Sequence, residues 1–223
     1  MDITLTAADG HAFTAYLCGP ADARAGVVVL PEIFGINTHI RQMADHFAAQ
    51  GYRAICPSLF DRAENGGQGP QLDYDDAGLN LGQALRKTVR DEDALLDIEA
   101  AAAALEGQHT RLVTGYCWGG YLSWRVACLS STFSAASCWY GGNIARHRHD
   151  TPRIPVQMHF GGEDHFIPIA DVQAIQAAQP GLPVYVYPEA GHAFGRAGTP
   201  AHHPASAALA WERTLAFFAE HAA

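Results

Sequence analysis

Apolar, β-branched segments alternate with helix-forming segments from Ala25 to the end of the chain. Residues 25–31 are apolar on both faces, as a strand buried inside a parallel sheet would be. An amphipathic segment follows at residues 37–50, and Gly51 supplies a helix stop before the next strand. Such alternation predicts an α/β fold, with a mostly parallel central sheet and helices on both faces.

The remaining segments are also consistent with an α/β fold. Two short alternating runs joined by Asp9-Gly10 predict a hairpin at residues 2–17. Residues 61–82 are rich in Gly and Asp and weakly periodic, so we expect a long surface excursion that helps to form a site. Further strands are expected at 52–60, 111–116, 133–140, 155–160 and 183–189, and further helices at about 89–105, 118–129, 169–178 and 204–221.

Composition limits the kind of protein. Of the 223 residues, 48% are hydrophobic and 17% charged, and no repeat or linker interrupts them, so we expect a single domain over residues 1–223. Only 14 residues are Lys or Arg and the net charge is −9, which argues against a nucleic-acid partner. An anionic substrate would need one or two locally placed arginines.

The N-terminal segment has no basic region and no long apolar run, so we expect neither a signal peptide nor a membrane span. Five cysteines without C-x-x-C spacing are typical of reduced thiols in a cytoplasmic protein. The 12 histidines lack i, i+4 or HExxH spacing, so we expect no metal site. Four cysteines lie in apolar stretches and are expected to be small buried hydrophobes, namely Cys18, Cys56, Cys128 and Cys138.

The segment GYCWGG, residues 115–120, comes directly after a predicted strand and opens a predicted helix. This is the context of a nucleophile elbow, a strained turn that lifts a nucleophile above the sheet. Gly115 and Gly119 are small where the two chain segments crowd each other, and the new helix directs N–H groups at Cys117, which favours a thiolate. On the motif alone, a βα turn around a buried cysteine remains the alternative.

Two polar turns, GGEDH and AGHAF, each follow a later predicted strand. Open parallel sheets collect functional groups at such strand ends, and α/β-hydrolases place nucleophile, acid and histidine in this chain order. We therefore expect Asp164 to orient His192, and His192 to pair with Cys117. Glu163 or Asp171 could supply the carboxylate instead, but Glu163 lies beside the tip of its turn and Asp171 falls within the next predicted helix.

The loop PEIFG follows the first buried strand. In the α/β-hydrolase fold this loop supplies one amide of the oxyanion hole, and the residue after the nucleophile supplies the other. We therefore expect the hole to consist of the backbone N–H groups of Ile33 and Trp118, each worth about 3 kcal/mol in the transition state. Glu32 could point into the site beside Cys117, and an exposed loop carboxylate is the alternative.

The motifs PEIFG, CPSLFDR, GYCWGG, YGG, GGEDHFIP and EAGHAFGR closely resemble those of the dienelactone hydrolase (carboxymethylenebutenolidase) family, and they cover nearly the whole chain. The resemblance implies a lactone hydrolase of the α/β-hydrolase fold with the same triad. It also implies that Glu32 contacts the resting thiol and takes its proton when substrate binds. Arg196 would bind the substrate carboxylate, and Tyr140 would flank the site.

The chain departs from the family in one loop. Members of the family carry a second substrate-binding arginine and a nearby tyrosine at about residues 79–83, where this sequence reads LNLGQ without a cation. Arg62 or Arg86 could substitute for that arginine. Trp118 is also bulkier than the aliphatic residue common in the family, which would narrow the pocket.

These features predict hydrolysis of a small activated ester or lactone through an acyl-thioester, without a cofactor. A thiolate attacks readily but is itself expelled when the leaving group is poor, which favours enol lactones over amides. We expect a monomer or weak homo-oligomer that binds a small molecule, and neither nucleic acid nor membrane. The alternatives are a carboxylesterase of the same family acting on a different ester, a catalytically silent thiol-bearing binding protein, and a thiol redox protein. The absence of a resolving cysteine in the motif counts against the last.

Overall fold

The computed structural model describes residues 1–63 and 69–222. They fall into two compact units, Met1–Leu112 and Val113–Ala223. The described residues include eight strands of one sheet. Each unit contains parallel strand pairs that alternate with helices along the chain, which confirms the predicted α/β class. A single domain over residues 1–223 stays a prediction.

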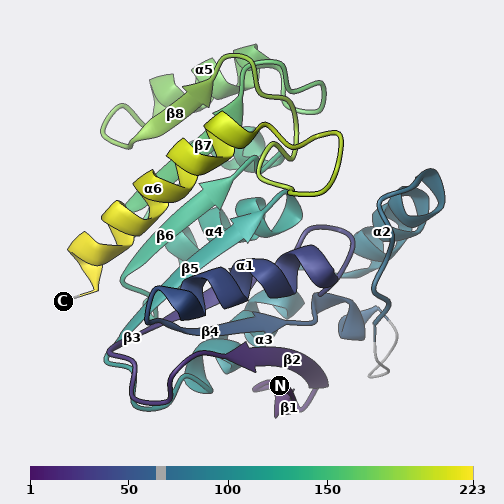
Figure 1. Ribbon diagram of the computed structural model, residues 1–223, viewed down its shortest axis with the longest axis vertical. Coiled ribbons are helices and arrows are strands. Elements are labelled where there is room, and N and C mark those ends of the chain that lie inside the picture. The colour runs from purple at the N-terminus through teal and green to yellow at the C-terminus, as the bar shows by residue number, and fades with distance from the viewer. Residues whose placement is uncertain (64–68, 223) are drawn as a thin grey trace. The chain divides into compact units, whose positions relative to one another are not determined.

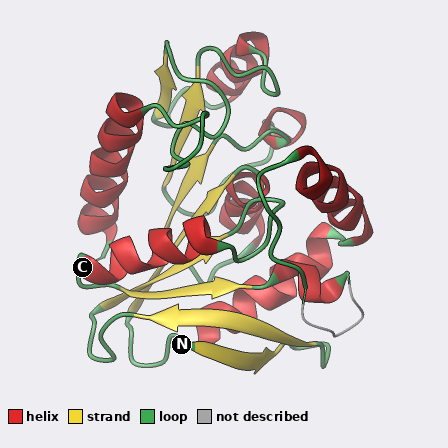
Figure 2. Ribbon diagram, turned by 45° about the vertical axis from the view of Figure 1, so that its right-hand side comes forward, coloured by secondary structure: helices red, strands yellow, loops and turns green. Residues whose placement is uncertain are grey.

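The first unit carries strands in the order β1-β2-β4-β3, of which β3 and β4 are parallel and the other two pairs antiparallel. Figure 2 shows β1 and β2 as the strand pair beside the N-terminus, where the hairpin was predicted. Helices α1 and α3 cover opposite faces of β3 and β4 (Figure 1). The elements are β1 (Asp2–Thr6), β2 (Ala12–Cys18), β3 (Ala25–Leu30), α1 (Thr38–Ala49), β4 (Arg53–Pro57), η1 (Leu59–Arg62), α2 (Asp76–Thr88) and α3 (Asp91–Ala103).

The second unit carries the parallel strands β6, β7 and β8, and β5 crosses the boundary between the units. Helices α4 and α6 pack on opposite faces of β6 (Figure 1). Both units therefore have helices on the two faces of their strands, as predicted. The elements are β5 (Thr110–Tyr116), α4 (Trp118–Leu129), β6 (Ala135–Trp139), η2 (Ile144–His147), β7 (Val156–Gly161), α5 (Ile169–Ala178), β8 (Val184–Tyr187) and α6 (Pro204–His221).

Local sequence explains the ends of α1. The Asn37 side chain accepts a hydrogen bond from the Ile40 amide at 3.3 Å and caps the first turn. Gly51 has φ +87°, and its amide donates to the Ala48 carbonyl, so the chain leaves the helix in a conformation that glycine adopts without strain. Gly51 therefore ends the helical segment, and after Tyr52 the chain enters β4 at Arg53.

The expected excursion at residues 61–82 is only partly correct. Residues 64–68 lie outside the described part, and residues from Asp76 onward form α2. The Asp75 carboxylate caps this helix by accepting from the Gly78 amide at 2.7 Å. Gly82 is required because a Cβ there would come within 2.0 Å of the Ile33 carbonyl oxygen. Gly78 and Gly82 weaken the helical pattern of the sequence. In the structure, however, Gly78 donates to the helix cap and Gly82 allows the close approach of α2 to Ile33.

Among the helices that the structure describes, none combines the length and the hydropathy needed to cross a bilayer.

Candidate active site

Cys117 occupies the sharp turn between β5 and α4, with φ 55° and ψ −110°. This backbone conformation is strained for a non-glycine residue, at a cost of order 1–3 kcal/mol. Hydrogen bonds of the Cys117 amide and carbonyl groups maintain this backbone conformation. The Cys117 amide donates to the Trp139 carbonyl at 3.0 Å, and the Cys117 carbonyl accepts from the Tyr121 amide at 3.1 Å. The turn thus projects the sulfur at the start of a helix, where N–H groups favour negative charge.

Glycines make the turn possible. A Cβ at Gly115 would lie 2.2 Å from the Gly119 carbonyl oxygen, so the crowding expected between these two positions is present. A Cβ at Gly120 would lie 2.2 Å from the Trp139 carbonyl oxygen. Gly120 is therefore needed for the approach of β6, a requirement that the elbow motif alone does not indicate.

Asp164 lies in the turn after β7, and its side chain has no exposed surface. Its Oδ2 accepts a hydrogen bond from His192 Nδ1 at 2.8 Å. Its Oδ1 accepts from the backbone amides of Phe166 at 2.8 Å and Ile167 at 3.0 Å. Both oxygens are engaged, so the carboxylate has one orientation and directs one of its oxygens at the imidazole.

His192 connects this carboxylate to the elbow. Burial disfavours its charged form, but the Cys117 sulfur and the Asp164 carboxylate, with hydrogen bonds to both, outweigh burial and raise the pKa of His192 from 6.5 to about 10. The ring also meets Tyr140 and Phe166 in edge-to-face contacts, with centroids 5.2 and 5.1 Å away. The imidazole is therefore fixed in place and favoured as the cation.

Strained backbone gathers at these strand ends. In the described residues, the non-glycine residues with positive φ are Cys117 (55°), Tyr140 (38°) and Ala193 (60°). They follow β5, β6 and β8 respectively, and each neighbours or forms part of the predicted site. Backbone strain of this kind concentrates at functional sites, where the surrounding structure maintains it.

The two alternative carboxylates lie apart from this arrangement. Glu163 is exposed on the same turn, and Asp171 lies in the first turn of α5. The structure therefore brings Asp164, rather than either alternative, to the imidazole.

Arg196 and Tyr140, which the family resemblance implies, lie on the second unit. Arg196 is half-buried, and its amide donates to the Ala193 carbonyl at 2.8 Å. The Arg196 carbonyl accepts from the Thr199 hydroxyl at 2.9 Å. Arg196 is thus anchored by the turn that carries His192, whereas Tyr140 is fully buried beside the imidazole.

Glu32 and Ile33 lie in the first unit, directly after β3. Glu32 is fully buried, so the alternative of an exposed loop carboxylate is wrong. The Tyr74 hydroxyl donates to Glu32 Oε2 at 3.1 Å. Sequence reasoning missed Tyr74, because it falls in the weakly patterned stretch and its partner is 42 positions away.

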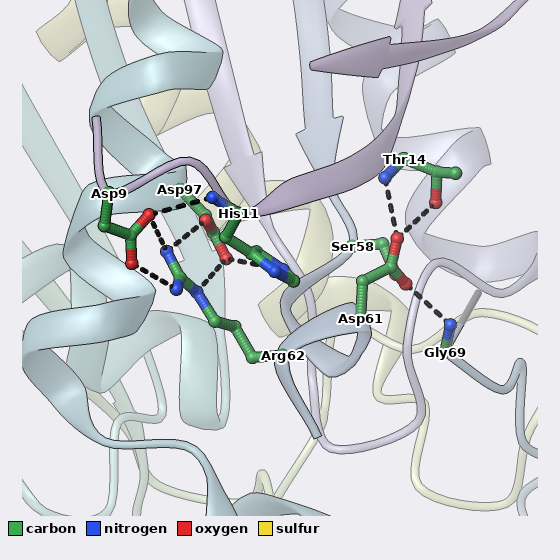
Figure 3. Close-up of polar contacts among 8 residues, drawn as sticks. All are labelled: Asp9, His11, Thr14, Ser58, Asp61, Arg62, Gly69 and Asp97. Carbon is green, nitrogen blue, oxygen red and sulfur yellow. Dashed lines mark hydrogen bonds and ion pairs between the residues drawn. The ribbon is translucent and has the colours of Figure 1, made fainter. Parts of the chain in front are cut away.

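The two arginines that could replace the missing family arginine have other partners. Arg62 donates to Asp9 at 2.6 Å and to both oxygens of the buried Asp97 at 2.9 and 2.7 Å (Figure 3). Arg86 donates to Asp91 at 3.1 Å. Both guanidinium groups form ion pairs within the first unit. The structure therefore gives no support for either arginine as the replacement for the missing family arginine.

The other cysteines are unreactive by environment. Burial raises the pKa of Cys56 and Cys138 well above the usual value and that of Cys128 to about 12. Cys18 is only half-buried, contrary to expectation, yet burial and a hydrogen bond with Asp45 raise its pKa to about 12. In the described part of the chain no group of three or more His, Cys, Asp or Glu side chains could hold a metal ion.

Comparison with known protein families matches residues 13–222 to the dienelactone hydrolase family. The carboxymethylenebutenolidase of Pseudomonas putida is 35% identical over 228 residues, which cover 97% of this chain and 95% of that protein. The enzyme of the same name from Pseudomonas knackmussii gives the same values.

Solved structures agree with these relatives. A Klebsiella pneumoniae protein, described as a proposed dienelactone hydrolase, is 33% identical with a TM-score of 0.82, and the match covers 98% of this chain and 99% of that chain. A Pyrococcus furiosus esterase has a TM-score of 0.72 at 12% identity, over 100% of this chain and 93% of that chain. This second likeness concerns the fold alone, which is that of the α/β-hydrolases.

Proposed function

The chain belongs to the dienelactone hydrolase family and is a hydrolase of lactone or ester bonds, and we propose that it works through a Cys117-His192-Asp164 triad. The observation that carries this proposal is the imidazole of His192, which hydrogen-bonds to both the Asp164 carboxylate and the Cys117 sulfur. Three turns that lie far apart in the sequence contribute these groups.

In the first step, Cys117 Sγ attacks the carbonyl carbon of the substrate. A C–S bond forms, the carbonyl electrons move to oxygen, and collapse of this oxyanion breaks the bond to the leaving oxygen. The raised pKa of His192 keeps a proton on the imidazolium during this attack. That proton then passes to the enolate or alkoxide that leaves.

The oxyanion requires donors while it exists. We assign the backbone N–H groups of Ile33 and Trp118 to this role, each contributing about 3 kcal/mol. Support comes from the position of Trp118, which is the first residue of α4 and directly follows the nucleophile. The helix N-terminus adds a favourable field at the same point.

The second step is hydrolysis of the thioester. Acylation neutralises the Cys117 sulfur and so removes a contribution that raises the pKa of His192. The neutral imidazole, still oriented by Asp164, takes a proton from water as the oxygen attacks the acyl carbon. The C–S bond breaks, the acid departs, and the thiolate takes back the proton that Glu32 held, which restores the resting thiol.

Three further residues have proposed roles that follow from family membership. Glu32 takes the proton of the resting thiol, Arg196 binds a substrate carboxylate, and Tyr140 flanks the site. Support for the role of Glu32 comes from its fixed position, because it is fully buried and accepts a hydrogen bond from Tyr74. The matching experiment compares lactones with and without a carboxylate in wild type and Arg196→Ala. A carboxylate preference lost in the variant is expected, and equal preference in both would refute the role.

The substrate class is a small activated ester, and an enol lactone fits best. A good leaving group matters, because otherwise the tetrahedral adduct returns to the thiolate and substrate. One observation favours a different ester within the family. The loop at residues 79–83 carries no cation, and Arg62 and Arg86 form ion pairs elsewhere. A substrate with one carboxylate, or none, is consistent with that arrangement.

Replacement of Cys117 by alanine tests the proposal. We expect kcat/KM on activated aryl esters and lactones to fall by at least about 10⁴-fold, because nucleophile and base act as a unit. Cys18→Ala is the matched control, since Cys18 is also part-exposed but has a raised pKa, and it should retain wild-type rates. Near-normal rates in Cys117→Ala would remove the nucleophile.

Two other hypotheses make different predictions. A silent binding protein would have an unactivated thiol, so iodoacetamide would react with Cys117 slowly at neutral pH. A thiol redox protein would form a sulfenic acid under mild peroxide and need a reductant to recover. The triad proposal instead requires that alkylation of Cys117 abolishes hydrolysis.

A further inference from the structure

The carboxylate of Glu32 is fully buried, and a neutral side chain donates to it. Tyr74 Oη lies 3.1 Å from Glu32 Oε2, which is hydrogen-bond distance. A buried carboxyl group needs hydrogen-bond partners, and each partner also restricts where its oxygens lie. The Tyr74 hydroxyl therefore restricts the position of the Glu32 carboxyl group.

The Tyr74 ring is fixed against the loop that carries Glu32. Its centroid lies 4.7 Å from that of Phe34 in an edge-to-face contact. The Leu72 amide donates to the Phe34 carbonyl at 2.9 Å. Gly35 has φ +72°, and a Cβ there would come within 2.4 Å of the Pro70 carbonyl oxygen. The two segments are packed backbone to backbone, which holds the phenol beside the loop that carries Glu32.

The segment that carries Tyr74 is anchored on both sides. Before it, the Asp61 carboxylate accepts from the Gly69 amide at 2.6 Å and from the Thr14 amide at 2.6 Å (Figure 3). After it, Asp75 caps α2 by accepting from the Gly78 amide at 2.7 Å. These anchors place the hydroxyl before any substrate arrives, which is the arrangement expected of a preorganised group.

We propose that Tyr74 is a positioning residue that keeps Glu32 aligned to accept the thiol proton. The proposal rests on the proposed function in one respect, namely that Glu32 accepts that proton. The hydrogen bond from the Tyr74 hydroxyl restricts where Oε2 of Glu32 lies, so its loss should slow the proton transfer.

Tyr74→Phe tests this proposal, because phenylalanine keeps the ring against Phe34 and removes only the hydroxyl. We expect kcat/KM at neutral pH to fall roughly tenfold, the factor for one hydrogen bond to a charged group. The loss should lie in kcat, because Glu32 serves a step of the reaction, whereas weaker substrate binding would raise KM. A purely structural role would change the thermal midpoint without any coupling to position 32.

The Glu32→Gln background separates the two residues. With the Glu32 carboxylate already replaced, Tyr74→Phe should cause no further loss of kcat. Tyr16→Phe is the matched control, because the Tyr16 hydroxyl also donates to a carboxylate, Asp45, at 2.8 Å in the same unit. It should leave kcat and KM unchanged.

The outcomes distinguish this inference from the triad. An unchanged kcat in Tyr74→Phe, an equal loss in the Glu32→Gln background, or wild-type rates in Glu32→Gln would each overturn the role of Tyr74. None of these would affect the nucleophile, which Cys117→Ala tests separately. A loss of kcat that is present in the wild-type background and absent with Glu32→Gln supports the role of Tyr74.

Discussion

His192 Nδ1 lies 2.8 Å from Oδ2 of Asp164, and the other oxygen of that carboxylate accepts two backbone amides. The amides set the carboxylate plane, and the carboxylate in turn sets the imidazole. The orientation of the base is thus built into the turn after β7 and does not depend on substrate binding.

Asp164→Asn should lower kcat on the order of 10³–10⁴-fold while the chain stays folded. The amide oxygen can still accept from the backbone, but the NH₂ group opposite Nδ1 favours the wrong tautomer. Steady-state kinetics with circular dichroism checks this. Asp171→Asn, in α5, is the control and should behave as wild type, and more than a tenth of wild-type activity in Asp164→Asn would contradict the assignment.

Removal of the sulfur should lower the pKa of His192. In the wild type the Cys117 sulfur and Asp164 raise it from 6.5 to about 10, so the ring stays protonated across neutral pH. In Cys117→Ala only Asp164 remains, and the ring should release its proton at least about one pH unit lower. NMR titration of the imidazole nitrogens measures both values, and coincident curves would mean that the sulfur and the ring do not interact.

Gly115→Ala should prevent formation of the elbow. The added Cβ would lie 2.2 Å from the backbone oxygen of Gly119, which no side-chain movement relieves. We expect a loss of about 3 kcal/mol in the free energy of unfolding, measured with urea. At Gly181 a Cβ meets nothing within 4 Å, so Gly181→Ala should cost little, and equal stability of the two variants would contradict the crowding.

A buried histidine away from the site should make the fold sensitive to acid. His159 on β7 is fully buried between the Tyr187 and Thr214 hydroxyls, and burial together with Arg213 lowers its pKa from 6.5 to about 3. Between these pH values the unfolded chain binds a proton that the folded chain does not. This contribution to stability is therefore complete above pH 6.5 and is lost by about 1.4 kcal/mol per unit as the pH falls through that window.

His159→Gln should be less stable at pH 7.5 but should show a shallower decline between pH 6.5 and 5 in urea unfolding. His109→Gln replaces an exposed histidine and should keep the wild-type slope. Parallel slopes for wild type and His159→Gln would show that His159 does not cause the acid sensitivity.

Much of the candidate site was visible in the sequence, because its groups sit at chain features with strong local signals. The elbow glycines flank Cys117, and Asp164 and His192 each follow an apolar strand. The bounds of α4, α5 and α6 also matched the expected ranges. Pro204 is the first residue of α6, a position where the backbone N–H has no partner within the helix and its absence costs nothing. This start signal lies in the local sequence and does not depend on distant contacts.

Features that depend on distant partners could not be predicted. The buried Glu32 accepts a hydrogen bond from Tyr74, 42 positions away, in a segment whose composition suggested a loop. Arg62 was available to a substrate on sequence grounds, and only the fold shows it bound to Asp97 on α3. Gly82 reads as a helix breaker until its approach to the Ile33 carbonyl is known.

The most direct test of the account is to trap the acyl-enzyme. His192→Ala should still acylate slowly with an activated aryl ester but should lack the base that hydrolyses the thioester, so the intermediate should accumulate. After an acid quench, peptide mass spectrometry should find the acyl group on Cys117. An acyl group on another residue would contradict a thioester mechanism. So would turnover by the wild type with no acyl group on Cys117 at any quench time.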